Sequence, residues 1–229
     1  MKKLVIAALA FALLPGGADS IQRPKIVFAV GVAAVVLFVS CLIMATLPIF
    51  ERHERIAAGE QAILMDGDVD RAILEFSAAA VSDPLSPEPL EKLAEAFFSR
   101  WQAGRRELSS PDDFARCRDA LRMAIQQDPQ NSSRYRRLGE IDSAKFARTH
   151  DPKDAAAAAD ALTQAVARYP NDASLRAARA TALAEAGRTA DSKAEADRAL
   201  RLDEINRKNG HTDRYLSDPT VIQLRRLAG

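Results

Sequence analysis

Four stretches of the chain share one six-residue phrase at the end of an apolar segment: Ala79-Ala-Val-Ser-Asp-Pro84, Ala124-Ile-Gln-Gln-Asp-Pro129, Ala165-Val-Ala-Arg-Tyr-Pro170 and Ala199-Leu-Arg-Leu-Asp-Glu204. The last residues of successive copies lie 45, 41 and 34 positions apart. These spacings correspond to a 34-residue unit with insertions of 11, 7 and 0 residues. A fixed period of this length predicts a repeat architecture, in which each unit buries its apolar face against its neighbours.

The composition around these phrases favours helices. Residues 51–229 are rich in alanine, arginine, glutamate and leucine, and contain only 11 valine and isoleucine residues. Alanine and leucine are strong helix formers, whereas strands prefer β-branched side chains. The proline that ends three of the phrases lacks a backbone N–H, and therefore separates one helix from the next. The sequence thus predicts an all-α fold.

The repeats resemble the tetratricopeptide repeat family, whose unit is a pair of helices with small and large apolar residues at set positions. The resemblance implies an α-α superhelix of about four such pairs over 51–204, with repeats at about 53–86, 87–131, 132–172 and 173–204. The matching positions are Gly67, Ala72, Phe76, Ala79 and Pro84; Leu90, Leu93, Ala94, Phe97, Cys117, Leu121, Ala124 and Pro129; Tyr135, Leu138, Gly139, Ala158, Leu162, Ala165 and Pro170; and Ala180, Leu183, Gly187, Ala196 and Ala199.

Two repeats depart from the family pattern. In the first, Glu60 stands where the family usually has glycine or alanine against the neighbouring helix. In the fourth, Arg176 and Arg179 replace apolar residues, and Glu204 replaces the proline. We expect a last repeat that is exposed on one side to tolerate such charges.

The insertions and the C-terminal segment contain helix-start signals. Ser110-Pro111-Asp112-Asp113 and Asp151-Pro152-Lys153-Asp154 each combine a capping residue, a proline in the first turn and an acid near the positive helix end. Between the helices of the second repeat, 102–109 is predicted as a loop or a frayed helix end. Ser217-Asp218-Pro219 starts a short helix, and we expect the segment 205–229 to cap the open apolar end of the last repeat.

The N-terminal part of the chain has a different composition. Residues 26–50 contain no charged side chain, and 25 residues of helix exceed the roughly 30 Å of a bilayer's hydrocarbon core. Lys25 precedes this stretch, and the charged cluster Glu51-Arg52-His53-Glu54-Arg55 follows it. The sequence predicts a transmembrane helix that inserts into membrane lipid and makes the chain an integral protein of an inner or plasma membrane. Since nothing between Phe50 and Gly59 breaks a helix, we expect the span to continue into the first repeat.

Residues 1–25 form a short apolar segment and a loop. Lys2 and Lys3, the apolar residues 4–14 and the small residues 16–18 have the proportions of a secretory signal. Cleavage near Ala18 would leave fewer than ten residues before the next apolar stretch, so we favour an uncleaved helical hairpin turning at Pro15-Gly16-Gly17. The first arm is short for a full crossing, which indicates helix tilt, local thinning of the bilayer or a truncated N-terminus. The basic residues do not define which side of the membrane carries residues 51–229.

In tetratricopeptide arrays, as the resemblance implies, a protein or peptide partner binds in the concave groove lined by the first helix of each pair. The positions carried over are Glu54, Ala57, Gln61, Leu64, Glu88, Glu91, Glu95, Phe98, Ser133, Arg136, Arg137, Glu140, Ser174, Ala177 and Thr181. The Lys and Asn that clamp a peptide carboxylate in some members are absent. We expect an acidic centre beside Arg136 and Arg137 that receives a basic or zwitterionic segment, or alternatively a merely solvated charged face.

No catalytic, cofactor or metal motif occurs in the sequence. Phrases for nucleotide binding, zinc hydrolysis or serine nucleophiles are missing, and the three histidines are far apart. Cys41 lies in the apolar stretch and Cys117 at a small repeat position, so both are predicted to be packing residues. Residues 51–229 carry 28 basic and 30 acidic side chains, a balance that argues against nucleic-acid binding. We expect no cofactor, and the oligomeric state is left open.

Two functions fit the sequence. The first is a membrane-anchored scaffold for protein–protein interaction, without enzymatic activity. The second is the C-terminal portion of a polytopic enzyme, because the apolar stretch, its charged exit and the segment 202–216 diffusely resemble bacterial O-antigen ligase or polymerase-like proteins. That resemblance implies glycan transfer by membrane parts outside this chain.

Overall fold

The computed structural model describes residues 23–104 and 111–229, and within these ranges every regular element is helical. The prediction of an all-α fold is therefore confirmed. The elements are α2 (Arg23–Gln61), the π-helical turn η1 (Ala62–Asp66), α3 (Val69–Ser82), α4 (Glu88–Ala103), α5 (Pro111–Gln127), α6 (Ser132–Thr149), α7 (Pro152–Arg168), α8 (Ala173–Glu185), α9 (Thr189–Lys208), the 3₁₀ turn η2 (Thr212–Arg214) and α10 (Asp218–Ala228).

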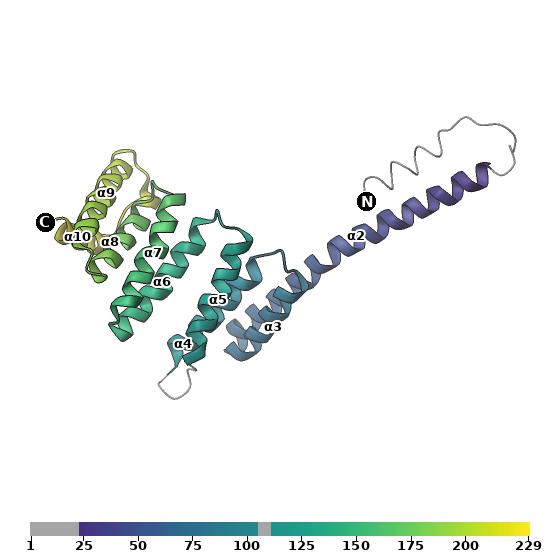
Figure 1. Cartoon of the computed structure of the whole chain (residues 1–229), viewed down its shortest axis with the longest axis horizontal. Helices are drawn as coiled ribbons and strands as arrows, with labels where there is room; N and C mark the ends of the chain where they lie inside the picture. The colour runs from purple at the N-terminus through teal and green to yellow at the C-terminus, as the bar shows by residue number, and fades with distance from the viewer. Residues whose placement is uncertain (1–22, 105–110) are drawn as a thin grey trace.

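The helices form consecutive pairs that stack into an elongated array (Figure 1). The pairs are α2 with α3, α4 with α5, α6 with α7, and α8 with α9, and each pair also packs on the next. Clusters of buried apolar residues follow one another along the array and join neighbouring pairs, and the large side chains Phe76, Leu121, Leu162 and Leu183 are almost fully buried in them. This is the superhelix of helix pairs that the repeat spacing predicts.

Small residues permit the close approach of helices. Gly139 of α6 lies against Leu162 of α7, and a Cβ atom at position 139 would come within 2.6 Å of Leu162 Cγ. No real Cβ makes such a contact, so glycine is required at this crossing. Ala94 and Ala180, which the sequence places at equivalent positions, are also buried.

The first repeat obtains the same close approach through a different residue from the expected one. Gly59 contacts Phe76, since a Cβ atom at position 59 would lie 2.5 Å from Phe76 Cε1, whereas Glu60 forms an ion pair with Lys92 of α4. The glycine is thus one position earlier than the family spacing suggests. The π-helical turn η1, which ends at the left-handed Gly67, accommodates the extra residue before the second helix begins.

Several predicted helix boundaries are confirmed. The side chain of Asp151 accepts a hydrogen bond from the N–H of Lys153 at the start of α7, and Ser217 accepts one from the N–H of Thr220 at the start of α10. Helix α4 ends at Ala103, and α5 begins at Pro111. The remainder of the insertion predicted as a loop, 105–110, and with it Ser110, lies outside the described residues.

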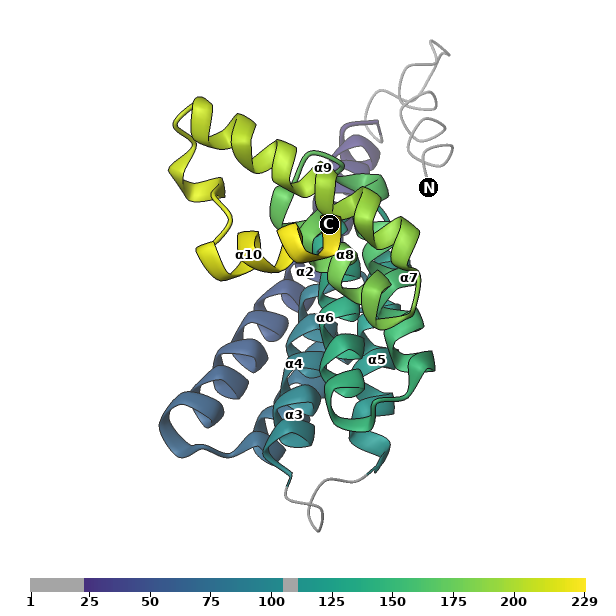
Figure 2. The ribbon, with the colours of Figure 1, turned by 90° about the vertical axis from the view of Figure 1, so that its left-hand side faces the viewer.

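Helix α10 closes the far end of the array, as predicted. It packs on α8 and α9 (Figure 2). Leu224 and Leu216 are buried there with Ala173, Ala177 and Ala180 of α8. Ala173 and Ala177 share this cluster with Leu216 and Leu224, so α10 and the segment before it cover apolar surface at the open end of the last repeat.

Helix α2 is continuous over 39 residues, from the apolar stretch into the first repeat. By length and composition it could cross a membrane, and none of its most apolar 18-residue window is buried in the protein. Arg52 and Arg55, just beyond the uncharged stretch, form ion pairs with Asp83 and Glu75 respectively. The N-terminal arm, signal or hairpin predicted for residues 1–20 lies outside the described residues.

Candidate functional site

The residues predicted to line a concave groove lie on the first helices of the four pairs, α2, α4, α6 and α8. Glu54 and Gln61 of α2 are exposed, and Glu88 at the start of α4 lies 3.9 Å from Nε of Arg52. These positions would form the end of the predicted groove nearest the apolar part of α2.

An ion-pair network joins α4, α6 and α8 at the centre of the groove. Arg137 of α6 donates two hydrogen bonds of 2.5 Å to the carboxylate of Glu95 on α4, and a third of 3.2 Å to Glu140. Arg136 donates to Glu140 at 2.9 Å and to the hydroxyl of Ser174 on α8 at 3.5 Å. Bidentate arginine–carboxylate pairs of this kind fix geometry as well as charge.

A second pair neutralises the remaining groove acid. Arg134 of α6 is 8% exposed and contacts both Glu91 of α4 and Asp128, the latter at 2.7 Å. Glu91, Glu95 and Glu140 are thus all paired with arginines. Acidic and basic side chains therefore alternate at the centre of the predicted groove, in what we call the charge lattice. The charges of its three glutamates are already compensated by arginines of the protein itself.

Phe98 forms part of the groove floor. Its side chain is 6% exposed, stacks on Trp101 with ring centroids 5.6 Å apart, and lies beneath the guanidinium of Arg137 at 4.9 Å. Phe98 therefore supports Arg137 from below, and its own ring offers little surface to a ligand.

The C-terminal end of the groove is covered by the protein itself. Gln223 of α10 donates a 3.1 Å hydrogen bond to the hydroxyl of Thr181, and Ala177 is buried beneath the same helix. A polar cavity of about 290 Å³ remains where the groove meets the segment after α9. Its lining includes Arg136, Tyr169, Ser174, Asn206, Arg214 and Tyr215.

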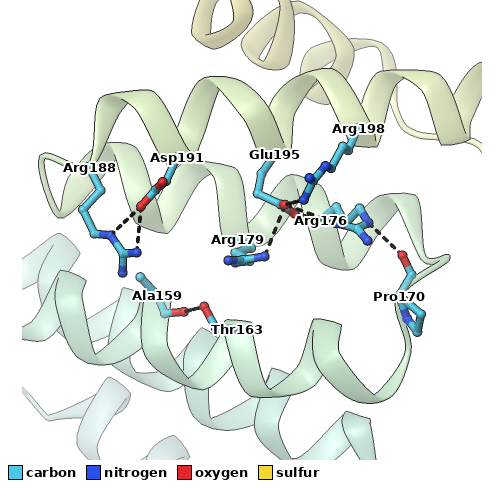
Figure 3. Close-up of polar contacts among 9 residues, drawn as sticks. All are labelled: Ala159, Thr163, Pro170, Arg176, Arg179, Arg188, Asp191, Glu195 and Arg198. Atoms are coloured by element: carbon cyan, nitrogen blue, oxygen red, sulfur yellow. Dashed lines mark hydrogen bonds and ion pairs between the residues drawn. The ribbon is translucent and has the colours of Figure 1, made fainter.

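The arginines that depart from the family pattern in the fourth repeat converge on one buried acid (Figure 3). Glu195 of α9 is 2% exposed and accepts hydrogen bonds from Arg176 at 2.8 Å and from Arg198 at 2.9 Å, while Arg179 approaches within 3.2 Å. Arg176 and Arg179 are mostly buried themselves. The expectation that these charges are tolerated by exposure is therefore wrong, because a carboxylate from the partner helix compensates them.

The remaining side chains that could in principle be reactive or bind a metal have structural roles. Burial raises the pKa of the Cys117 thiol to about 12, so it stays protonated and unreactive at neutral pH. Cys41 lies on the exposed apolar part of α2. Within 23–104 and 111–229, histidine, cysteine and acidic side chains form no cluster that could hold a metal ion.

Solved structures of repeat proteins share this architecture. MamA aligns with 84% of this chain and 99% of its own, at a TM-score of 0.54 and 17% identity. Residues 41 to the end of MamA from Desulfovibrio magneticus RS-1 align with 77% of this chain and 94% of their own, at 0.51 and 16%. PilF of Pseudomonas aeruginosa aligns with 79% and 76%, at 0.50 and 16%. These are tetratricopeptide-repeat proteins, so the chain has the tetratricopeptide-repeat fold. No family model and no curated protein matches the sequence.

Proposed function

We propose that this tetratricopeptide-repeat array is a scaffold that is tethered to a membrane through α2 and holds another protein in its concave groove. The observation that carries the proposal is the continuity of α2, which leads from 25 uncharged residues directly into the first repeat. A helix of that length spans about 37 Å, enough to cross a bilayer. The matched structures lend no support to the glycan-transfer alternative.

The joint between the apolar part of α2 and the array is stiff. Gly59 packs on Phe76, and the ion pairs of Arg52 with Asp83 and of Arg55 with Glu75 join α2 to α3 close to the point where α2 leaves the array. A scaffold built in this way holds its groove at a fixed distance from the membrane and at a fixed angle to the spanning part of α2. A flexible linker would leave the groove free to rotate.

The charge lattice of the groove favours a partner segment of mixed charge. Each glutamate of the centre is paired with an arginine, so a purely basic segment would have to compete with Arg134, Arg136 and Arg137. A segment with both acidic and basic side chains can pair its bases with the groove glutamates and its acids with the groove arginines, so that no charge is left uncompensated. We therefore prefer the zwitterionic partner to the basic one.

Site-specific photo-crosslinking of the membrane-embedded full chain tests the groove. A photoreactive residue at Ser174, exposed in the groove on α8, should yield a crosslinked partner that the same residue at Met123, exposed on the second helix α5, does not. The Arg136→Glu variant should weaken the Ser174 product, because it places two like charges side by side at Glu140. Equal products at both positions would contradict groove binding.

Insertion of a Gly-Ser stretch after Phe50 tests the rigid tether. The insertion breaks α2 between the apolar stretch and the array and leaves every groove contact intact. If the fixed height of the groove matters, the insertion should reduce the Ser174 crosslink in membranes. Unchanged crosslinking would mean that the membrane segment serves only as an attachment.

A further inference from the structure

Two large apolar side chains project into solvent where α3 turns into α4. Val81 in the last turn of α3 is 79% exposed, and Leu85 in the turn itself is 88% exposed. Neither side chain belongs to the buried cluster of the first repeat. Figure 1 shows this turn beside α2, at the point where α2 leaves the array.

The pairing of α2 with α3 defines the level of this turn along α2. Gly59 lies opposite Phe76, and Arg52 lies opposite Asp83 at 2.8 Å. Because the two helices are antiparallel, each step forward in α3 is a step back in α2. Leu85 is therefore level with about Phe50, the last residue of the uncharged stretch.

The turn is held at this level from two directions. The side chain of Arg52 is 15% exposed, and its guanidinium donates a hydrogen bond to Asp83, which precedes the turn. On the other side, the amide of Gln127 at the end of α5 donates a 2.7 Å hydrogen bond to the carbonyl of Pro84. These two contacts fix the position of the turn that carries the exposed apolar side chains.

We propose that the α3–α4 turn is a second membrane contact, in which Leu85 and Val81 insert into the interface of the bilayer beside α2. The inference rests on the proposed function, since the lipid surface must lie at Phe50. An apolar group at that level enters the boundary between headgroups and acyl chains, where burial of nonpolar area stabilises binding. A second contact beside the helix fixes the tilt of the array, which a single span alone does not fix.

The experiment uses the full chain reconstituted into phosphatidylcholine vesicles, with Trp101→Phe as the background because Trp101 is the only tryptophan. Single tryptophans are introduced as Leu85→Trp, Phe50→Trp and Leu74→Trp. Leu74 is the matched control: it is 70% exposed on α3, but lies about 16 Å farther from the span along the helix axis. Lipids brominated near the headgroup end of the acyl chains serve as quenchers.

Emission from Leu85→Trp and Phe50→Trp should fall by about half in brominated vesicles, because interfacial groups insert about 5–10 Å and reach the bromines. Emission from Leu74→Trp should not change. Quenching at position 50 with none at position 85 would overturn the second contact and leave the anchor intact. Absence of quenching at position 50 would overturn the anchor itself. Equal quenching at positions 85 and 74 would also contradict the proposal, since it would place all of α3 on lipid.

Discussion

At the scale of single residues, Asp142 of α6 is the most unusual side chain in the described part of the array. It is 1% exposed, and Nε of Arg118 lies 3.0 Å from Oδ1. That N–H is not directed at the oxygen, and neither carboxylate oxygen has a hydrogen-bond partner among the described residues. Burial raises the pKa of Asp142 to about 6, and the charges of Arg118, Arg122 and Lys145 only partly offset this effect, while Asp154 reinforces it.

This environment predicts a pH dependence of stability. Because the pKa is higher in the folded state than in the unfolded chain, the folded state binds the proton more tightly, and the contribution of Asp142 to stability falls as the pH rises through 6. Between pH 5 and pH 7 the loss is about 1 kcal/mol. Urea unfolding of the full chain and of Asp142→Asn at both pH values measures it: the wild type should lose about 1 kcal/mol more than the variant over this range. Parallel pH profiles would contradict the raised pKa.

At the scale of secondary-structure elements, Glu195 determines how α8 and α9 pack. Its carboxylate lies between two mostly buried arginines of α8, so its removal would leave their charges uncompensated in a desolvated interface. Loss of one member of a buried pair typically costs about 3–5 kcal/mol. Asp191 of the same helix also pairs with an arginine, Arg188, but both side chains are about half exposed (Figure 3).

We therefore expect Glu195→Ala to lower the free energy of unfolding by about 3 kcal/mol, and the matched control Asp191→Ala by at most about 1 kcal/mol. The triple variant Glu195→Leu, Arg176→Leu and Arg179→Leu should regain most of the loss, because it replaces charges with apolar contacts. Denaturant unfolding of the full chain compares the three variants. A similar cost for both alanine variants would show that burial does not set the strength of the Glu195 pairs.

The same elements show how far sequence could predict this fold. The period, the helix pairs and the capping by Asp151 and Ser217 follow from local signals that act within one or two turns of helix. The role of Glu195 does not follow from local signals, because it depends on a contact between two helices: the face of α9 that carries Glu195 packs against Arg176 of α8. Glu60 was misplaced for a related reason: a π-helical turn absorbs one residue, and no sequence signal distinguishes that from a shift of the pattern.

The groove shows the same limit of prediction. The first helices were identified correctly from the repeat register, but the pairing of Glu95 with Arg137 joins positions 42 residues apart. The sequence alone suggested an acidic centre, because it shows how many glutamates lie on the first helices but not which arginines pair with them. Coverage of Thr181 by Gln223 likewise depends on where α10 docks.

At the scale of the whole molecule, each helix pair is stabilised by packing against the neighbouring pairs. Among the described residues, the extensive contacts of each pair are with its neighbours, so an array of this kind unfolds most easily from its ends. One end is continuous with the long helix α2. The other depends on α10, whose Leu224 is 1% exposed against the alanines of α8, while Ile222 of the same helix is 52% exposed.

Substitution of Leu224 should consequently produce a graded loss of protection along the array. In Leu224→Asp, the buried charge should release α10 and expose Ala173 and Ala177, so amide hydrogen exchange should accelerate most in α8 and α9, less in α6 and α7, and least in α4 and α5. Ile222→Asp, in which the new charge faces solvent, should exchange like the wild type. Equal acceleration in all four pairs would mean that the array unfolds as one cooperative unit. Loss of the cap formed by α10 would then destabilise the first pair, α2 with α3, as much as the last.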